Sequence, residues 1–256
     1  MEASERRVAV VGDDGRASTL RDAVEGVGAD LTDLASASDA AEAPIVVALG
    51  DEAIRDAAVS APDGTVIPVG DRRLAFDRDG AVAALRELLG AAAAGERVAR
   101  VEHPVMAVTD GTAPPAKALF DVALVTSEPA RISEFAVDFT ERQTESVRAD
   151  GVVVATPLGS DGYANAVGGP IVEPGGGFPV APIAPFSTRT DTWVTPDRVR
   201  LTVEREGEPV AIVVDGERRS VVAPHRPVAI EPVDRVAFAA PVAARERADR
   251  KHSNNS

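Results

Sequence analysis

A stretch rich in small and hydroxyl-bearing residues, ATPLGSDGYANAVGGPIVEPGGG at 155–177, holds the side chains best suited to ligand binding. The apolar run GVVVA leads into this stretch, which also contains the only tyrosine of the chain, Tyr163. Glycines let the backbone approach a ligand closely, and Thr156 and Ser160 offer hydroxyl groups. These features are typical of a site for a polar small molecule, but also of an ordinary glycine-rich loop, and composition leaves both open.

Carboxylates lie next to several apolar runs, where a general base could be placed. Asp51 directly follows PIVVALG, and Asp150 directly precedes GVVVA. Each has a structural alternative, since Asp51 could cap a helix and Asp150 could belong to a plain turn. Asp215-Gly216 is the strongest short hairpin signal in the chain, so turn chemistry explains this pair without a ligand.

The N-terminal part of the chain alternates apolar runs with helix-like segments. This alternation predicts a parallel sheet covered by helices. Ser18 is expected to cap the first helix, and the most regular apolar periodicity lies at 79–94. The expected strands are 7–12, 44–50 and 65–70, and the later helices are 51–60 and 79–94.

From about residue 98 the sequence changes to β-branched, alternating runs separated by Gly, Pro and Asp. This pattern predicts a mostly β structure. The fold class is therefore α/β plus all-β: a small N-terminal α/β domain at 1–97, a larger C-terminal β-rich domain at 98–240 and a polar tail at 241–256. The expected strands are 98–108, 117–126, 131–140, 151–156, 198–206, 209–224 and 235–240.

The order of residues around the 155–177 stretch resembles the signature of NAD kinases. In that family an Asp-Gly and an apolar strand lead into T-P-T-G-S-T-A-Y, a short helix and G-G-P-I, and here the chain reads ADGVVVATPLGSDGYANAVGGPIV. Upstream, VVALGDEAI stands in the place of the family's G-G-D-G-T loop and ALFDVAL in the place of A-L-N-(E/D)-V. Downstream, APIAPF is similar to P-I-(S/C)-P, and VVDGE is similar to the closing D-G-Q hairpin.

This resemblance implies an NAD kinase-like fold and an ATP-dependent phosphorylation of the adenosine ribose 2′-hydroxyl of NAD, which gives NADP. ATP is then the phosphoryl donor, and a divalent cation, Mg²⁺, is the cofactor. The domain at 1–97 would bind nucleotide, and the domain at 98–240 would bind NAD. The family tends to form oligomers, so a homo-oligomer is expected.

The same resemblance implies roles for individual residues. Asp51 matches the aspartate that acts as the base. Asp121 matches the carboxylate that holds the dinucleotide, although it could also be a charge at the edge of a strand. No metal ligand is assigned, and the remaining residues expected to bind substrates are Glu52, Asp150, Thr156, Asp161, Gly162, Tyr163 and Asn165.

The segment Leu49-Gly50-Asp51-Glu52-Ala53 departs from the family loop, because it lacks two glycines and the threonine. Glycines there let backbone N–H groups close on phosphate oxygens, whereas side chains and the Glu52 carboxylate oppose a polyphosphate. One alternative follows from this departure: a catalytically degenerate paralogue acting as a nucleotide-binding regulatory or structural protein. Another alternative is a kinase with a lipid or sugar acceptor, because related kinases share a glycine-rich G-G-D-G loop. Arg72 and Arg73 could meet phosphate directly or form solvated charges.

Composition argues against several other classes of protein. The 256 residues carry 41 Asp and Glu against 27 Lys and Arg, a net charge of -14, so no nucleic acid or membrane partner is expected. The lack of cysteine excludes disulfides and thiolate chemistry. The acidic excess, with Lys117 and Lys251 as the only lysines, indicates a halophilic protein. No apolar run is long enough to cross a bilayer, so a cytoplasmic location is expected.

Overall fold

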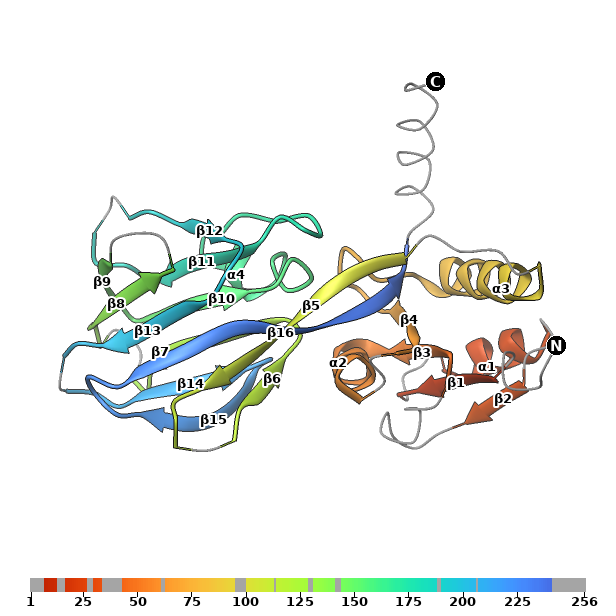
Figure 1. Ribbon diagram of the computed structural model, residues 1–256, viewed down its shortest axis with the longest axis horizontal. Coiled ribbons are helices and arrows are strands. Elements are labelled where there is room, and N and C mark those ends of the chain that lie inside the picture. The colour runs from red at the N-terminus through yellow and green to blue at the C-terminus, as the bar shows by residue number, and fades with distance from the viewer. Residues whose placement is uncertain are drawn as a thin grey trace, which may run out of the picture. The chain divides into compact units, whose positions relative to one another are not determined.

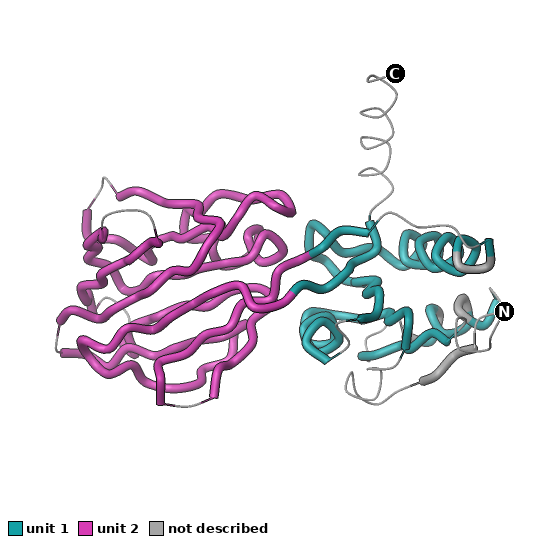
Figure 2. The backbone as a smooth tube through the Cα atoms, in the orientation of Figure 1, with its two compact units in different colours: residues 1–102, 235–256 teal, residues 103–234 magenta. Residues whose placement is uncertain are grey.

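The chain forms two compact units, which we call unit 1 and unit 2 (Figure 2). Unit 1 comprises Met1–Glu102 and Arg235–Ser256, and unit 2 comprises His103–Asp234. The last strand of the chain thus returns to unit 1, whereas the sequence-based ranges divide the chain once, near residue 98. The computed structural model describes residues 7–12, 17–26, 30–33, 43–60, 63–94, 100–112, 114–128, 131–140, 144–187, 190–205 and 207–240.

Unit 1 contains a parallel sheet in the order β2-β1-β3-β4-β16, in which β16 joins through its C-terminal end (Figure 1). Every residue of β3 and β4 is buried, as expected for parallel strands with both faces covered. The three predicted strands of this region are confirmed, and β2 is an additional one. The bounds are β1 Arg7–Val11, β2 Asp30–Asp33, β3 Ile45–Leu49, β4 Thr65–Val69 and β16 Pro227–Ala239.

Three helices pack on this sheet: α1 Ala17–Gly26, α2 Gly50–Ser60 and α3 Arg78–Ala94. Leu20 of α1 and Leu85 of α3 share one apolar cluster with the sheet, while α2 contacts β3 and β4 through small side chains such as Ala57. The helices predicted at 51–60 and 79–94 are confirmed. The prediction that Ser18 caps the first helix is wrong, because α1 begins at Ala17 and Ser18 lies inside its first turn.

Unit 2 contains two packed sheets of mainly antiparallel strands (Figure 1). One has the order β12-β11-β10-β7-β14-β15, and the other is built from β9, β8, β13, the first part of β16, β5 and β6. One apolar cluster takes side chains from both sheets, so the sheets pack face to face. The bounds are β5 Arg100–Thr109, β6 Ala116–Ala118, β7 Asp121–Thr126, β8 Ser133–Phe139, β9 Glu145–Ala149, β10 Gly151–Ala155, β11 Phe178–Ile183, β12 Trp193–Thr195, β13 Val199–Val203, β14 Val210–Val214 and β15 Glu217–Val222.

A short helix, α4 Tyr163–Ala166, covers the outer face of the six-stranded sheet. Ala164 packs there with Val153 and Ala181, and small side chains on both elements let α4 approach the sheet closely. Together with the β-rich unit 2, the helix-covered sheet of unit 1 confirms the predicted fold class. Within the described ranges, no helix is long and apolar enough to span a membrane.

Candidate functional site

Tyr163, one of the residues expected to bind the dinucleotide, is the first residue of α4. Tyr163 is 42% exposed. Partial burial raises the pKa of the Tyr163 phenol, and the carboxylates of Asp121 and Asp150 raise this pKa further, because a nearby negative charge disfavours the phenolate. Asp121 and Asp150 therefore each lie within electrostatic reach of Tyr163.

The two carboxylates are placed by opposite ends of β10. Asp121 is the first residue of β7 and pairs with Ala155, the last residue of β10. It is 9% exposed, and β7 lies between β10 and β14, so Asp121 is not a charge on an edge strand. Asp150 directly precedes β10, and its N–H donates to the Ile183 carbonyl at 2.9 Å. Because β9 and β10 belong to different sheets, Asp150 marks a crossing between sheets rather than a hairpin turn.

The hydroxyl groups of the 155–177 stretch hold the loop together. The Thr156 hydroxyl donates to the Leu119 carbonyl at 2.6 Å and accepts from the Gly159 N–H at 3.1 Å. The Ser160 hydroxyl accepts from the Val172 N–H at 3.0 Å. Both hydroxyl-bearing residues are fully buried, so they position the backbone that leads to Tyr163.

The other residues predicted from the signature surround the start of α4. Asp161 and Gly162 are half-buried in the turn before the helix. Asn165 is exposed, and its side-chain amide donates to the Gly169 carbonyl at 3.2 Å. Gly169 leaves no room for a side chain, since a Cβ there would lie 2.7 Å from the Ala164 carbonyl oxygen. The Gly-Gly-Pro segment therefore closes the loop against α4.

The predicted base lies in unit 1, in the first turn of α2. Gly50 begins this helix with φ +81°, a conformation that glycine adopts readily. Asp51 and Glu52 follow as exposed residues, where the helix dipole favours negative charge. The Asp51 Oδ2 atom lies 2.8 Å from the Arg72 Nη2 atom, and the Arg72 side chain is only 20% exposed. Arg72 is therefore an ion-pair partner of Asp51 rather than a solvated charge.

Asp51 also lies at the edge of the parallel sheet where ligands bind in open α/β folds. In the sheet, β2 lies on one side of β1 and β3 lies on the other side. The strand order therefore reverses between β1 and β3. In such sheets the ligand site lies outside the carboxyl ends of the strands at this reversal. Gly12, with φ +92°, follows β1 there, and a Cβ on it would lie 2.5 Å from the Leu49 carbonyl oxygen.

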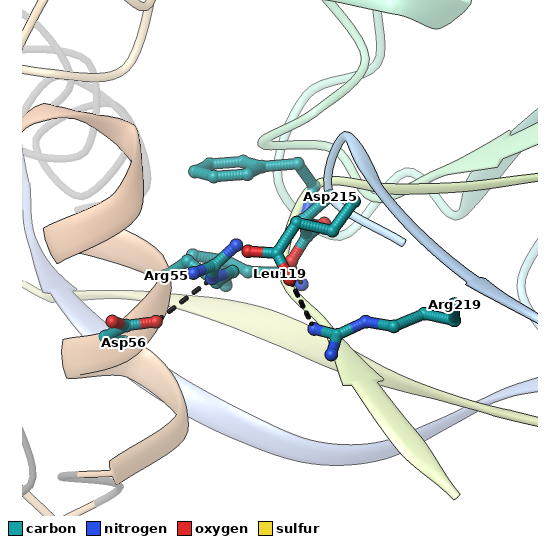
Figure 3. Close-up of polar contacts among 7 residues, drawn as sticks. Arg55, Asp56, Leu119, Asp215 and Arg219 are labelled. Atoms are coloured by element: carbon teal, nitrogen blue, oxygen red, sulfur yellow. Dashed lines mark hydrogen bonds and ion pairs between the residues drawn. The ribbon is translucent and has the colours of Figure 1, made fainter. Parts of the chain in front are cut away.

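Asp215 has a second role that the sequence reasoning missed. The structure confirms the predicted turn: Asp215 and Gly216 have φ +47° and +81°, and the flanking Val214 and Glu217 pair with each other. The Asp215 carboxylate also accepts the N–H of Leu119 at 2.8 Å (Figure 3). No sequence signal indicates this contact, because the Asp-Gly pair is already explained by the turn.

Comparison with solved structures shows that this is the fold of NAD kinases. An NAD kinase from Archaeoglobus fulgidus in complex with ATP has a TM-score of 0.69 and 25% sequence identity, covering 92% of this chain and 94% of that one. Yeast NADH kinase complexed with NADH has the same fold at 16% identity, with a TM-score of 0.72 over 92% of this chain and 84% of that one.

The family match lies mainly in unit 2. Residues 119–237 match the family described as the ATP-NAD kinase C-terminal domain. A bifunctional NADP phosphatase/NAD kinase of Methanocaldococcus jannaschii is 41% identical over 102 residues, 39% of this chain and 18% of that protein. An NAD kinase of Methanosarcina barkeri is 37% identical over 101 residues, 38% of this chain and 37% of that protein. These matches thus cover less than two fifths of either relative. Asp121, Asp150 and Tyr163 lie inside the family match, and Asp51 lies outside it.

Tyr163 should titrate above the ordinary tyrosine pKa of about 10. Asp150→Asn removes one of the negative charges that raise this pKa, so the pKa should fall toward its ordinary value. The pKa of Tyr163 is raised in the folded state. The protonated phenol of Tyr163 therefore contributes to stability fully below about pH 10, and this contribution is lost as the pH rises through the folded-state pKa. Phenolate absorbance reports on this residue alone, since the chain has one tyrosine.

Asp110→Asn is the matched control for this titration, because the Asp110 carboxylate serves an exposed local turn, where it accepts the Thr112 N–H at 2.9 Å. It does not contribute to the raised pKa of Tyr163. Equal titration curves for the Asp150 and Asp110 variants would contradict the grouping of Asp150 with Tyr163.

Proposed function

We propose that the protein is an NAD kinase, which transfers the γ-phosphoryl group of ATP to the adenosine ribose 2′-hydroxyl of NAD and releases NADP and ADP. The observation that carries this proposal is the grouping of Tyr163 with Asp121 and Asp150, inside the segment that is similar to the ATP-NAD kinase C-terminal domain. The solved relatives described in complex with ATP and with NADH support the two substrates.

Phosphoryl transfer requires an aligned hydroxyl, a group that takes its proton and neutralisation of the phosphate charge. Asp51 of unit 1 accepts the proton of the 2′-hydroxyl while the oxygen forms its bond to the γ-phosphorus, and the bond between this phosphorus and the bridging oxygen of ADP breaks. In unit 2, the carboxylates of Asp121 and Asp150 accept hydrogen bonds from the dinucleotide, and the exposed Tyr163 ring packs against it.

Mg²⁺ is held in many phosphoryl-transfer sites by one or two carboxylates, substrate phosphates and water. Glu52, an exposed carboxylate in the first turn of α2, could supply one such ligand. The described part of the chain contains no cluster of three ligating side chains, so the ion would be held mainly by the ATP phosphates and water, with Glu52 as a protein ligand. When bound, it neutralises phosphate charge.

Incubation of the purified protein with NAD, ATP and Mg²⁺ in molar KCl tests the proposal. NADP should form, and an NADP-specific dehydrogenase detects it. The high salt reflects the acidic composition, since screening reduces repulsion among the carboxylates. Folded protein that forms no NADP would overturn the assignment.

Arg72→Gln is expected to lower kcat by about 10-fold to 100-fold, because Asp51 loses the partner that orients it. The change in stability should stay within about 1 kcal/mol, as for most ion pairs with an exposed member. Arg73→Gln, at the exposed neighbouring position, is the control and should retain the wild-type rate. A kcat unchanged in Arg72→Gln would show that Asp51 is oriented without this pair.

One observation favours a second candidate, a non-catalytic nucleotide-binding paralogue. Asp51 is engaged by Arg72 in a loop that retains only Gly50 of its glycines, which disfavours close contact with a polyphosphate. Calorimetry separates the two functions. The paralogue would bind NAD without consuming ATP, whereas the kinase would show heat of turnover when both substrates are present.

A further inference from the structure

The Asp215 carboxylate holds three successive backbone N–H groups from a distant part of the chain. Oδ2 accepts from Leu119 at 2.8 Å, and Oδ1 accepts from Phe120 at 2.7 Å and from Asp121 at 3.0 Å. In return, the Asp215 N–H donates to the Asp121 carbonyl at 2.9 Å. Figure 3 draws Asp215 next to Leu119. Both carboxylate oxygens are thus committed to the segment Leu119–Asp121.

The segment needs these acceptors because the strand predicted at 117–126 is interrupted there. β6 ends at Ala118 and β7 begins at Asp121, so Leu119 and Phe120 lie between two ladders. Both are buried, and buried N–H groups without a partner are costly. The turn itself does not require a carboxylate, since Asn serves this turn position equally well. Only a carboxylate accepts from three N–H groups and donates to none.

The carbonyl groups of the same segment hold the loop that leads to Tyr163. Leu119 accepts the Thr156 hydroxyl at 2.6 Å, and Phe120 accepts the Thr156 N–H at 2.8 Å. Gly159 packs so closely on Phe120 that a Cβ would lie 2.1 Å from its carbonyl oxygen. The N–H groups of Leu119–Asp121 are therefore bound by Asp215. The carbonyl groups of Leu119 and Phe120 are bound by Thr156, in the loop that leads to Tyr163.

We propose that Asp215 is a positioning residue of the dinucleotide site, which fixes the Leu119–Asp121 backbone and so sets both the Asp121 carboxylate and the loop bearing Tyr163. This inference rests on the proposed function and deepens it. Asp215 acts through other residues and is not the base, since both of its oxygens already accept backbone N–H groups.

The test compares Asp215→Asn with the control Asp110→Asn in folded protein. The amide keeps the turn but places an N–H group where the carboxylate now accepts a backbone N–H, so two donors meet at that position. Displacing Asp121 removes a charge near the phenol, so the pKa of Tyr163 should fall toward its ordinary value in Asp215→Asn alone. The KM for NAD should rise about tenfold, as for the loss of one strong hydrogen bond, with the KM for ATP unchanged.

Two further measurements test the role of Asp215 if the first comparison fails. If Asp215→Asn does not fold, hydrogen exchange of the wild-type protein decides: the amides of Leu119, Phe120 and Asp121 should exchange as slowly as the core strands, and rapid exchange overturns the proposal. If the wild-type protein forms no NADP, the kinase assignment fails, while the Tyr163 titration and the exchange rates still judge Asp215. An Asp215→Asn variant that matches Asp110→Asn in both the titration and the KM for NAD would also overturn it.

Discussion

Asp51→Asn should lower the kcat of NADP formation by about a hundredfold to ten-thousandfold. The amide is nearly the same size as the carboxylate but does not take the proton of the 2′-hydroxyl. The fold should survive, because the Asp51 side chain is 54% exposed and its ion pair with Arg72 is worth at most about 1 kcal/mol. The rate of NADP formation in molar KCl measures the effect, and circular dichroism checks the fold.

Asp56→Asn is the matched control on the same helix. Asp56 is also half exposed and ion-paired with an arginine, Arg55, at 3.0 Å (Figure 3). The same chemical change there should leave the rate at the wild-type value. Activity retained in Asp51→Asn would mean that another group takes the proton, and equal losses in both variants would mean that the effect comes from α2 rather than from the base.

Gly159→Ala should destabilise the protein by about 3 kcal/mol or more and lower Tm by roughly 6–12 °C. A Cβ at this position would lie 2.1 Å from the Phe120 carbonyl oxygen and 2.7 Å from the Phe120 Cα atom. These are backbone atoms, so no side-chain rotation relieves the contact, and the loop must move away from the start of β7. The fluorescence of Trp193, the only tryptophan and a member of the unit 2 core, reports the thermal transition.

Gly207→Ala separates this steric effect from the general cost of replacing a glycine. Apart from its chain neighbours, no atom of the described residues lies within 4 Å of a Cβ built on Gly207, and the φ of Gly207 is not in the left-handed region. Its Tm should stay within about 2 °C of the wild-type value, as for most surface changes. A Gly159→Ala variant with the same Tm as Gly207→Ala would contradict the close approach of the loop to Phe120.

The elements of unit 1 could be predicted because their signals are local. Five apolar residues, Ile45–Leu49, are followed by Gly50 and two acids, and the structure ends β3 and begins α2 at that glycine. A strand buried on both faces is a continuous apolar run, and acids favour the first turn of a helix. Neither property depends on contacts far away in the sequence.

Strands β9, β11 and β12 were not predicted, and β11 shows why. It contains Pro179 and Pro182, and proline removes a ladder hydrogen bond, so such a run reads as a non-strand. In the structure, Pro182 pairs with β10 where β12 has already ended, and Pro179 pairs with β12 beyond the end of the β10 ladder. Each proline thus needs hydrogen bonds on one side only, which depends on where the neighbouring strands end.

The sequence by itself determined the two-part fold class and, through its resemblance to NAD kinases, the residues expected to bind the dinucleotide. Hydrophobic periodicity and motif order are properties of residues close together in the chain, so they can be recognised in the sequence alone. Only the tertiary structure decided that Asp51 is paired with Arg72, and that Asp215 holds Leu119–Asp121 from a hairpin distant in the chain. Hydrogen bonds and ion pairs depend on distances between atoms, and these distances are set by sheet pairing and packing rather than by separation along the chain.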